Sequence, residues 1–409
     1  MKMSKKFLSL ALAGALALGL TACQQSDPTE EQAQAYAQQV AGLDADTVLF
    51  TVNGQDVTAE FYLYWLANDC QYWDTMSYYY NGAGLDFAAD AMEGMTNAEY
   101  LKNDAQSIAA SYILLYQEAQ AKDAGLTEEQ QAEWDQAREN YITQNGQDAY
   151  DLLLRQSGVS ETVFEQIGTS NYLYQNLIDA LPAEEAAQYA EDNNLFKAKH
   201  ILLCTAQENE DGTVTLSTGA SITNADGTAY TGTAEEYNAQ VKAQAEDLLA
   251  QIEASDDPLT TFDELMNQYS EDTGLSSYPD GYTFTPEDSF VDEFKDAVYA
   301  LDYNEYSGLV ESDYGYHIIL RTDLSSECMA DQVNQWIENM EVVTTEAYDA
   351  LDAGTFYTNY LAYQEALLAE EDASAAPTDS AAPTDSAAPT DSAEPVDTAS
   401  PEPTGTAGT

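Results

Sequence analysis

The sequence is poor in basic residues: its 409 positions hold 12 Lys and Arg against 73 Asp and Glu, a formal net charge of −61. Because nucleic-acid binding requires clusters of Lys and Arg that neutralise phosphates, this composition excludes a nucleic-acid partner. It also argues against charge-driven adhesion to anionic lipid. The acidity does not indicate disorder, since 44% of residues are apolar and 29 are Tyr. The length indicates two domains with additional segments.

Long hydrophobic runs are absent except near the start. Residues 7–20 form an apolar run that follows three lysines, and it is shorter than the roughly 20 residues that a membrane-spanning helix needs. The run ends in Leu-Thr-Ala-Cys at 20–23, which resembles the bacterial lipobox, whose Cys receives diacylglycerol and becomes the first residue after cleavage. We therefore predict a lipoprotein signal peptide at 1–22 and lipidation of Cys23. The alternative is an ordinary secretory signal in which this Cys is incidental.

Cysteine and histidine are scarce, with four and two residues respectively. Once Cys23 is assigned, Cys70, Cys204 and Cys328 remain. An odd number without a C-x-x-C pair favours buried thiols over a disulfide framework. With only two histidines, a zinc site is discarded, and we expect neither a metal nor a cofactor.

Two polar segments flank the folded part. Residues 23–44 are polar and acidic, which predicts a tether. At the other end, Ala-Ala-Pro-Thr-Asp-Ser begins at 375 and repeats at 381 and 387. Such a composition cannot offset the entropy of ordering, so 371–409 is predicted to be a disordered tail.

Residues 45–195 are predicted to form a helical N-terminal domain with one small ribbon. An apolar run at 48–52 precedes Asn53-Gly54, a strong hairpin signal. An aromatic run follows between Tyr62 and Tyr80, and it is interpreted either as helix core or as a surface that contacts other polypeptides. Residues 326–370 are predicted to be helical, with Val333 and Trp336 on one apolar face.

Residues 196–325 have a mixed pattern. A strand is predicted at 197–205 and a β-hairpin insertion within 207–232. Helices are predicted at 234–254 and 261–269, and short strands near Tyr282 and at 308–321. The chain is therefore predicted to be of the α+β class.

The two histidines lie in apolar runs typical of strands. His200 begins His-Ile-Leu-Leu, and His317 lies in Tyr-Gly-Tyr-His-Ile-Ile-Leu at 314–320. Alone, such residues are more typical of a core than of an active site. Between them, however, lie Tyr-Ser-Glu-Asp at 269–272 and a pair of phenylalanines four residues apart, Phe290 and Phe294.

With these motifs in this order, residues 196–325 resemble the parvulin family of peptidyl-prolyl cis–trans isomerases. The lipobox, the helical N-terminal segment and the helices after the module resemble foldases of the PrsA/SurA type. The resemblance implies a small antiparallel sheet flanked by helices, inserted into a helical chaperone-like domain. It also implies that residues 326–370 pack back onto the N-terminal domain.

The resemblance implies roles for particular residues. The catalytic residues would be His200, Asp272 and His317. The substrate-binding residues would be Phe290, Phe294, Tyr282, Ser312 and Tyr314. Phe290 is bulkier than the Met or Leu usual there, and Tyr314 replaces a small residue, so these two side chains either reshape or narrow the proline pocket.

We therefore predict a peptidyl-prolyl isomerase that assists the folding of exported polypeptides at X-Pro segments. It would be held at the extracytoplasmic face of the cell membrane by its lipid anchor. The alternative is a holdase chaperone that uses the parvulin fold as a scaffold without catalysis. A solute-binding lipoprotein would explain the anchor but neither histidine motif.

Overall fold

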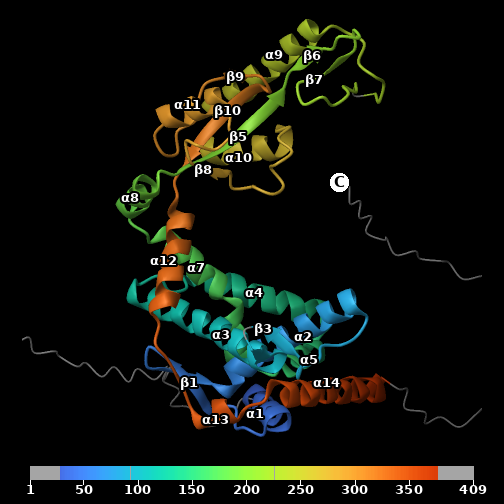
Figure 1. Ribbon diagram of the computed structural model, residues 1–409, viewed down its shortest axis with the longest axis vertical. Coiled ribbons are helices and arrows are strands. Elements are labelled where there is room, and N and C mark those ends of the chain that lie inside the picture. The colour runs from blue at the N-terminus through green and yellow to red at the C-terminus, as the bar shows by residue number, and fades with distance from the viewer. Residues whose placement is uncertain (1–27, 93, 225, 376–409) are drawn as a thin grey trace, which may run out of the picture. The chain divides into compact units, whose positions relative to one another are not determined.

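The computed structural model describes residues 28–92, 94–224 and 226–375 (Figure 1). The predicted signal peptide 1–22, the lipidation site Cys23 and residues 376–409 lie outside the described residues. Over the described residues, no helix combines the length and the apolar character that crossing a membrane requires. The predicted α+β class, with a small antiparallel sheet flanked by helices, is confirmed.

Helices predominate before and after the central sheet module. These elements are α1 (Pro28–Ala41), β1 (Val48–Val52), β2 (Gln55–Thr58), α2 (Ala59–Asn81), β3 (Asp90–Met92), β4 (Met95–Thr96), α3 (Asn97–Ala121), α4 (Glu128–Asn145), α5 (Gln147–Ser157), α6 (Glu161–Gly168), α7 (Ser170–Asp179), α8 (Ala183–Asn193), α12 (Ser325–Asn339), β11 (Val342–Thr344), α13 (Glu346–Ala350) and α14 (Ala353–Ala375). The predicted hairpin at Asn53-Gly54 joins β1 to β2, and both residues have the positive φ that this tight turn requires.

The prediction of a tether at 23–44 is wrong for its described part. Residues 28–41 form α1, in which Tyr36, Ala37 and Val40 are completely buried. These three positions form a narrow apolar stripe among glutamates and glutamines, so overall composition concealed it. The tail prediction also begins too early, because α14 continues through 371–375.

Chain segments far apart in sequence meet in one sheet. Strand β11 pairs antiparallel with β1, with Thr51 opposite Val343, and β1 also pairs with β2.

Helix α12 packs against α3, α7 and α8. Its Met329 is fully buried in an apolar cluster with Leu177, and Trp336 packs against that cluster. The predicted apolar face of 326–370 therefore has its cover on helices that precede the module.

The aromatic run of α2 divides into two parts. Tyr62 is fully buried and donates a hydrogen bond to the backbone carbonyl of Lys102. The buried positions of α2 end at Cys70, and the tyrosines and tryptophan beyond it are exposed. The core interpretation thus holds for the first half of the run only.

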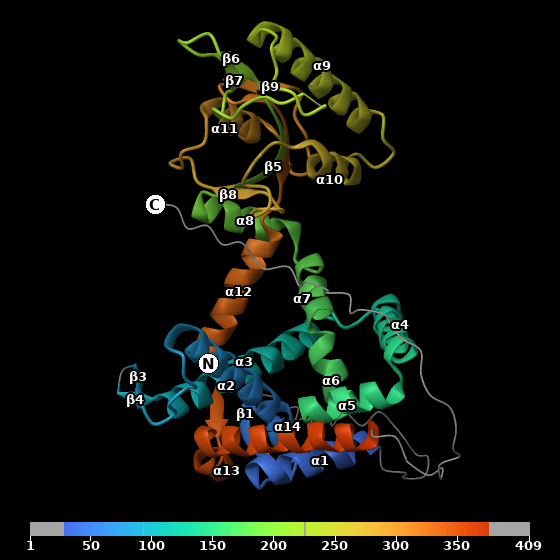
Figure 2. The same cartoon turned by 90° about the vertical axis from the view of Figure 1, so that its right-hand side faces the viewer.

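The central module is a four-stranded sheet with helices on both faces. Its elements are β5 (Phe196–Cys204), β6 (Ala206–Glu208), β7 (Val214–Leu216), α9 (Ala234–Glu253), α10 (Pro258–Tyr269), β8 (Tyr282–Phe284), α11 (Asp292–Ala300), β9 (Val310–Ser312) and β10 (Gly315–Thr322). The sheet order is β8-β5-β10-β9, and all of its pairs are antiparallel. Strands β6 and β7 form the predicted hairpin insertion. Figure 2 shows β5 between α11 on one side and α10 on the other.

Strand alternation decides which face each module side chain joins. Ile201, Leu203 and Ile318 point to the face covered by α9 and α10. Ala198 and Ile319 pack with Phe294 of α11 on the opposite face. The histidines occupy positions in phase with this second set, so both lie on the α11 side of the sheet.

Candidate active site

The two histidines are diagonal neighbours on the central strand pair. His200 of β5 lies opposite Ile319, and His317 of β10 lies opposite Leu202. Their imidazole rings are nearly parallel, with centroids 5.2 Å apart, and the two Nδ1 atoms are 3.0 Å apart. His317 is buried. The structure therefore brings together the two histidines that the sequence places 117 positions apart.

When His200 is neutral, its hydrogen-bond partners fix the direction of every donor in this network. A carboxylate only accepts, so His200 Nε2–H donates to Asp272 Oδ2 over 3.0 Å. A neutral His200 then has a bare Nδ1, which accepts from His317 Nδ1–H. The remaining His317 Nε2 accepts from Ser312 Oγ at 2.7 Å. Protonating both rings would set two donors against each other, so at most one ring carries a positive charge in this geometry.

Electrostatics support the same assignment. Burial, followed by the neighbouring His200, lowers the pKa of His317 to about 3, so this ring is neutral near pH 7. Partial burial would raise the pKa of Asp272, but hydrogen bonds from His200 and Tyr282 outweigh it and hold that pKa well below its usual range. An ionised Asp272 and a neutral His317 are the states that the donor directions require.

Asp272 follows α10 in a short loop that is bonded to β5. The Tyr282 hydroxyl donates to Asp272 Oδ2 at 2.7 Å, and the Gly274 N–H donates to Oδ1 at 3.0 Å. Burial, followed by this bond to Asp272, raises the pKa of Tyr282 well above its usual value. The Tyr282 hydroxyl therefore remains a donor across the physiological pH range.

Aromatic rings form a wall beside the imidazoles. Phe294 lies edge-on to His200, with centroids 5.3 Å apart. Phe290 stacks on Phe294 at 5.4 Å, and Tyr282 meets Phe290 edge-on at 5.4 Å. Phe290 also packs against Phe284, so its extra bulk is directed into this aromatic cluster.

The structure brings Ser312 and Tyr314 to the network in different ways. Ser312 bonds His317 directly through its hydroxyl. Tyr314 contributes its backbone N–H, which donates to Ser312 Oγ over 3.1 Å, while its side chain is about half exposed. Gly315 follows with φ +148°, and an added Cβ would lie 2.1 Å from the carbonyl oxygen of Leu203. The turn that holds Ser312 therefore requires glycine at this position.

Sequence reasoning missed the residues that dock the Asp272 loop. The Leu202 N–H donates to Ser270 Oγ, and the Cys204 N–H donates to Glu271 Oε2 at 2.6 Å. The sequence feature that could have indicated these residues was the polar Ser-Glu-Asp run directly after a helix. Cys204 is a buried thiol as predicted, and strand alternation places it on the histidine face of β5. Burial, followed by Glu271, raises its thiol pKa to about 11. This thiol is therefore not a nucleophile at neutral pH.

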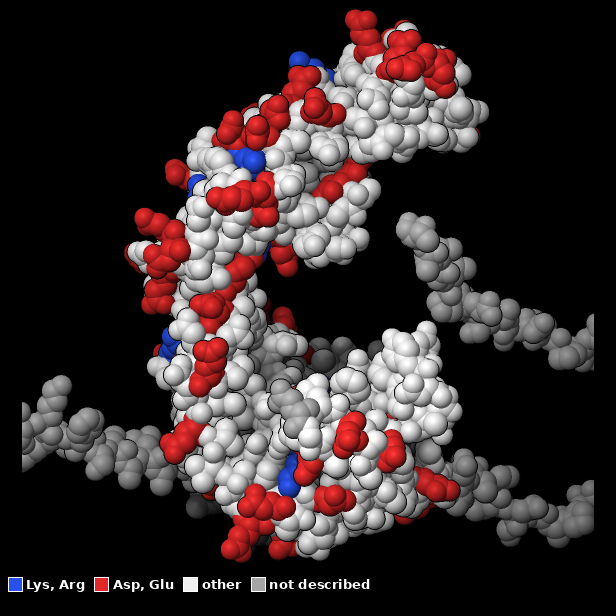
Figure 3. All heavy atoms as spheres, viewed as in Figure 1, with Lys and Arg blue, Asp and Glu red and all other residues white. Residues whose placement is uncertain are grey.

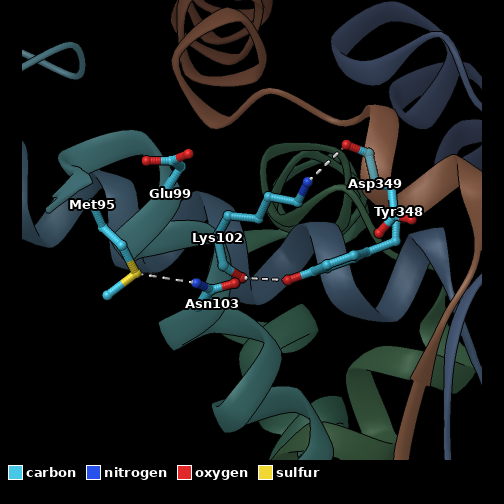
Figure 4. Close-up of a pocket in the computed structure, with 6 residues that line it drawn as sticks. All are labelled: Met95, Glu99, Lys102, Asn103, Tyr348 and Asp349. Atoms are coloured by element: carbon cyan, nitrogen blue, oxygen red, sulfur yellow. Dashed lines mark hydrogen bonds between the residues drawn. The ribbon is translucent and has the colours of Figure 1, made fainter. Parts of the chain in front are cut away.

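A second concave site lies away from the two histidines and is lined by different side chains. A pocket of about 300 Å³ is lined by Met95, Glu99, Lys102, Asn103, Tyr348 and Asp349 (Figure 4). Lys102 Nζ donates to the Asp349 carbonyl over 3.2 Å and lies 4.5 Å from the Tyr348 ring centroid. Its cation is thus already paired within the chain, and the pocket contains neither histidine. Among the described residues, no group of three His, Cys, Asp or Glu side chains is placed to hold a metal.

Comparisons with known proteins agree with this geometry. Residues 185–324 match the family model described as the PPIC-type PPIase domain. The chain is 39% identical to foldase protein PrsA 1 of Bacillus cereus over 90 residues, which covers 22% of this chain and 31% of that protein. It is 40% identical to foldase protein PrsA of Halalkalibacterium halodurans over 79 residues, or 19% and 22% of the two chains. The chain thus spans less than a third of either relative.

Among solved structures, PrsA from Bacillus subtilis is 17% identical and aligns with 68% of this chain and 92% of its own, at a TM-score of 0.24. The resemblance inferred from the histidine motifs is confirmed by the family match and the PrsA relatives. Residues 185–324 are therefore a parvulin-type domain of the PPIC-type peptidyl-prolyl isomerase family, similar to that of the PrsA foldases.

Proposed function

We propose that this chain is a peptidyl-prolyl cis–trans isomerase that assists the folding of exported proteins. The hydrogen-bond network beside the aromatic wall carries the proposal. Catalytic roles fall to His200, Asp272 and His317. The substrate-binding residues are Phe290, Phe294, Tyr282, Ser312 and Tyr314. The substrates are X-Pro segments of unfolded or partly folded polypeptides.

The physical chemistry of the reaction suits these side chains. Amide resonance sets a barrier of roughly 18–20 kcal/mol, and no bond to carbon has to break. Phe290 and Phe294 offer an apolar wall for the proline ring. Fixed polar groups beside it favour the twisted, less resonant amide over the planar one. A thousandfold acceleration needs only about 4 kcal/mol of such differential stabilisation.

A protease-coupled prolyl-peptide assay tests this activity. The parent should catalyse isomerisation, and Asp272→Asn should lose most of the activity because the charged acceptor of three hydrogen bonds disappears. Asp263→Asn is the matched control, since it removes a carboxylate paired with Lys199 in the same module but outside the network. Equal activities of the two variants would contradict the assignment.

The location at the outer face of the cell membrane, through a lipid on Cys23, belongs to the same proposal. The lipobox directly after the apolar run supports it. Cys23→Ser should move the protein from the membrane fraction to the medium. Retention of this variant in the membrane fraction would contradict lipid anchoring.

We also propose that 45–195 and 326–370 form one discontinuous domain, with 196–325 as an inserted module. The pairing of β1 with β11 and the cover of α12 by α7 and α8 support this division. Residues 196–325 expressed alone should fold, whereas 45–195 alone should not melt cooperatively. Cooperative melting of the latter segment would refute a single domain.

The alternative function is a holdase that binds polypeptide without catalysis. The exposed aromatic residues at the end of α2 favour it, because exposed apolar patches mark interaction sites. An inactive parent that still suppresses aggregation of an unfolded protein would establish this alternative.

A further inference from the structure

The last part of α2 presents a cluster of aromatic rings to solvent. We call Tyr78, Tyr79 and Tyr80 the tyrosine tip; they are 61%, 80% and 75% exposed. Earlier in the same helix, Tyr72 and Trp73 are 56% and 40% exposed, and their rings meet edge-on. No position of α2 after Cys70 is buried, so the side chains at this end of the helix do not belong to the hydrophobic core.

On the face seen in Figure 3, the surface at this end of the helix shows no charged side chain, although Asp74 of the same helix end is half-buried and accepts a hydrogen bond from the Leu85 N–H. In Figure 3, viewed as in Figure 1, the atoms over the C-terminal end of α2 are white, whereas acidic side chains spread over neighbouring surfaces. Exposing adjacent aromatic rings is costly in water, and such patches usually mark an interaction site. The α-helix alone does not require these residues, because aromatic side chains are only moderate helix formers.

The positions of the chain's own Lys and Arg side chains indicate which chemical groups of a partner would suit the tyrosine tip. Lys102 lies over Tyr348, Lys122 over Trp336, and Arg321 over both Phe196 and Tyr303. Three of the few bases of this protein thus lie over its own aromatic rings, and others pair with carboxylates. Among the described residues, no such cation–π contact involves the tyrosine tip, whose side chains are highly exposed, although the Tyr79 and Tyr80 rings meet edge-on with centroids 5.0 Å apart.

We propose that the tyrosine tip binds segments of unfolded polypeptide that carry Lys and Arg. Exposed ring faces attract guanidinium and ammonium groups. The formal charge of −61 draws cationic segments toward the protein before contact. The surface is independent of the proline site, so it would hold a chain whether or not that chain contains proline.

The experiment uses the full chain and a labelled, unstructured, proline-free peptide in which arginines alternate with Gly and Ser. Fluorescence anisotropy gives the dissociation constant at about 0.1 M salt. Replacing all three tip residues with Leu keeps the apolar area but removes the ring faces, and should weaken binding roughly tenfold. Replacing them with Phe keeps the faces and should preserve binding.

A matched control changes two other exposed tyrosines. Tyr141 and Tyr299 are each 38% exposed, and replacing both with Leu should leave binding unchanged. A peptide with Gln in place of Arg should bind weakly to every variant. Prolyl-peptide isomerisation should be the same in the parent and in the tip variants, which separates this proposal from the isomerase.

Three results would overturn the proposal. If the Leu variant binds as tightly as the parent, net charge alone or apolar area explains binding, because all variants have the same charge. If the Gln peptide binds as well as the Arg peptide, the surface does not select cations. If the Tyr141 and Tyr299 control loses as much affinity as the tip variant, binding is not located at the tip.

Discussion

Replacing His317 with Gln should change how stability depends on pH in a defined window. His317 is buried and neutral, with a pKa of about 3 in the folded chain against an ordinary value of 6.5. As pH falls below 6.5, the unfolded chain binds a proton at this ring and the folded chain does not. The folded state therefore loses stability as the pH falls below 6.5. The stability that comes from keeping His317 neutral is complete only above pH 6.5.

The expected size of this effect follows from the two pKa values. Between pH 7 and pH 5 the linkage amounts to about 2 kcal/mol of lost stability, at about 1.4 kcal/mol per pH unit below 6.5. The lowered pKa of Asp272 acts in the same direction, but it matters only below about pH 4, where an unfolded Asp takes up its proton. The window from pH 5 to 7 thus excludes the contribution of Asp272.

Hydrogen exchange at the amides of β5 and β10 measures the free energy of opening of this sheet within the full chain. Other carboxylates also titrate in this acidic protein, so the quantity of interest is the parent minus the Gln variant, in which their contributions cancel. The parent should lose about 2 kcal/mol more than the variant between pH 7 and 5.

A spectroscopic control is available because the chain has only two histidines. Their imidazole resonances can be followed by NMR, and the Gln variant assigns them. The His317 signal should not shift between pH 8 and pH 5. A midpoint near 6.5, or an equal loss of stability in parent and variant, would refute the buried, neutral state and the donor directions derived from it.

Three further changes test other contacts. Tyr282→Phe removes the hydroxyl that donates to Asp272 and should lower kcat/KM in the prolyl-peptide assay roughly tenfold, with the fold unchanged by circular dichroism. Gly315→Ala should destabilise the module by about 2 kcal/mol or more in hydrogen exchange, whereas Gly308→Ala, whose Cβ meets nothing within 4 Å, should have little effect. Met329→Ala should destabilise the helical part by about 2–5 kcal/mol in thermal unfolding, because this side chain is fully buried among α7 and α8 residues.

Much of the module could be predicted from sequence because its signals are local. The apolar runs around His200 and His317 predict strands, and the turn residues between the segments separate the helices from them. Phe290 and Phe294 are four residues apart, and the structure stacks their rings at 5.4 Å. Such patterns need no knowledge of tertiary contacts.

The remaining features depend on register and on sparse apolar positions. His200 bonds His317 only because β5 and β10 pair with Leu202 opposite His317, and a slip of one residue would turn one ring to the other face. No sequence pattern sets that register. Helix α1 was missed because only a few apolar residues among Gln and Glu are buried in it, and their partners lie on other helices, α2 and α5, and at Tyr363.

The closed hydrogen-bond network limits the chemistry that this site can perform. Asp272 accepts from three donors, and three of the four imidazole nitrogens are hydrogen-bonded to one another or to Asp272. The fourth is bonded to Ser312. A general acid or base would have to break one of these bonds before it could exchange a proton with substrate. Prolyl isomerisation requires no such proton transfer. It requires an apolar surface that holds the proline ring and fixed dipoles beside the amide. A site whose polar groups are satisfied before substrate arrives is therefore suited to stabilising a twisted amide electrostatically.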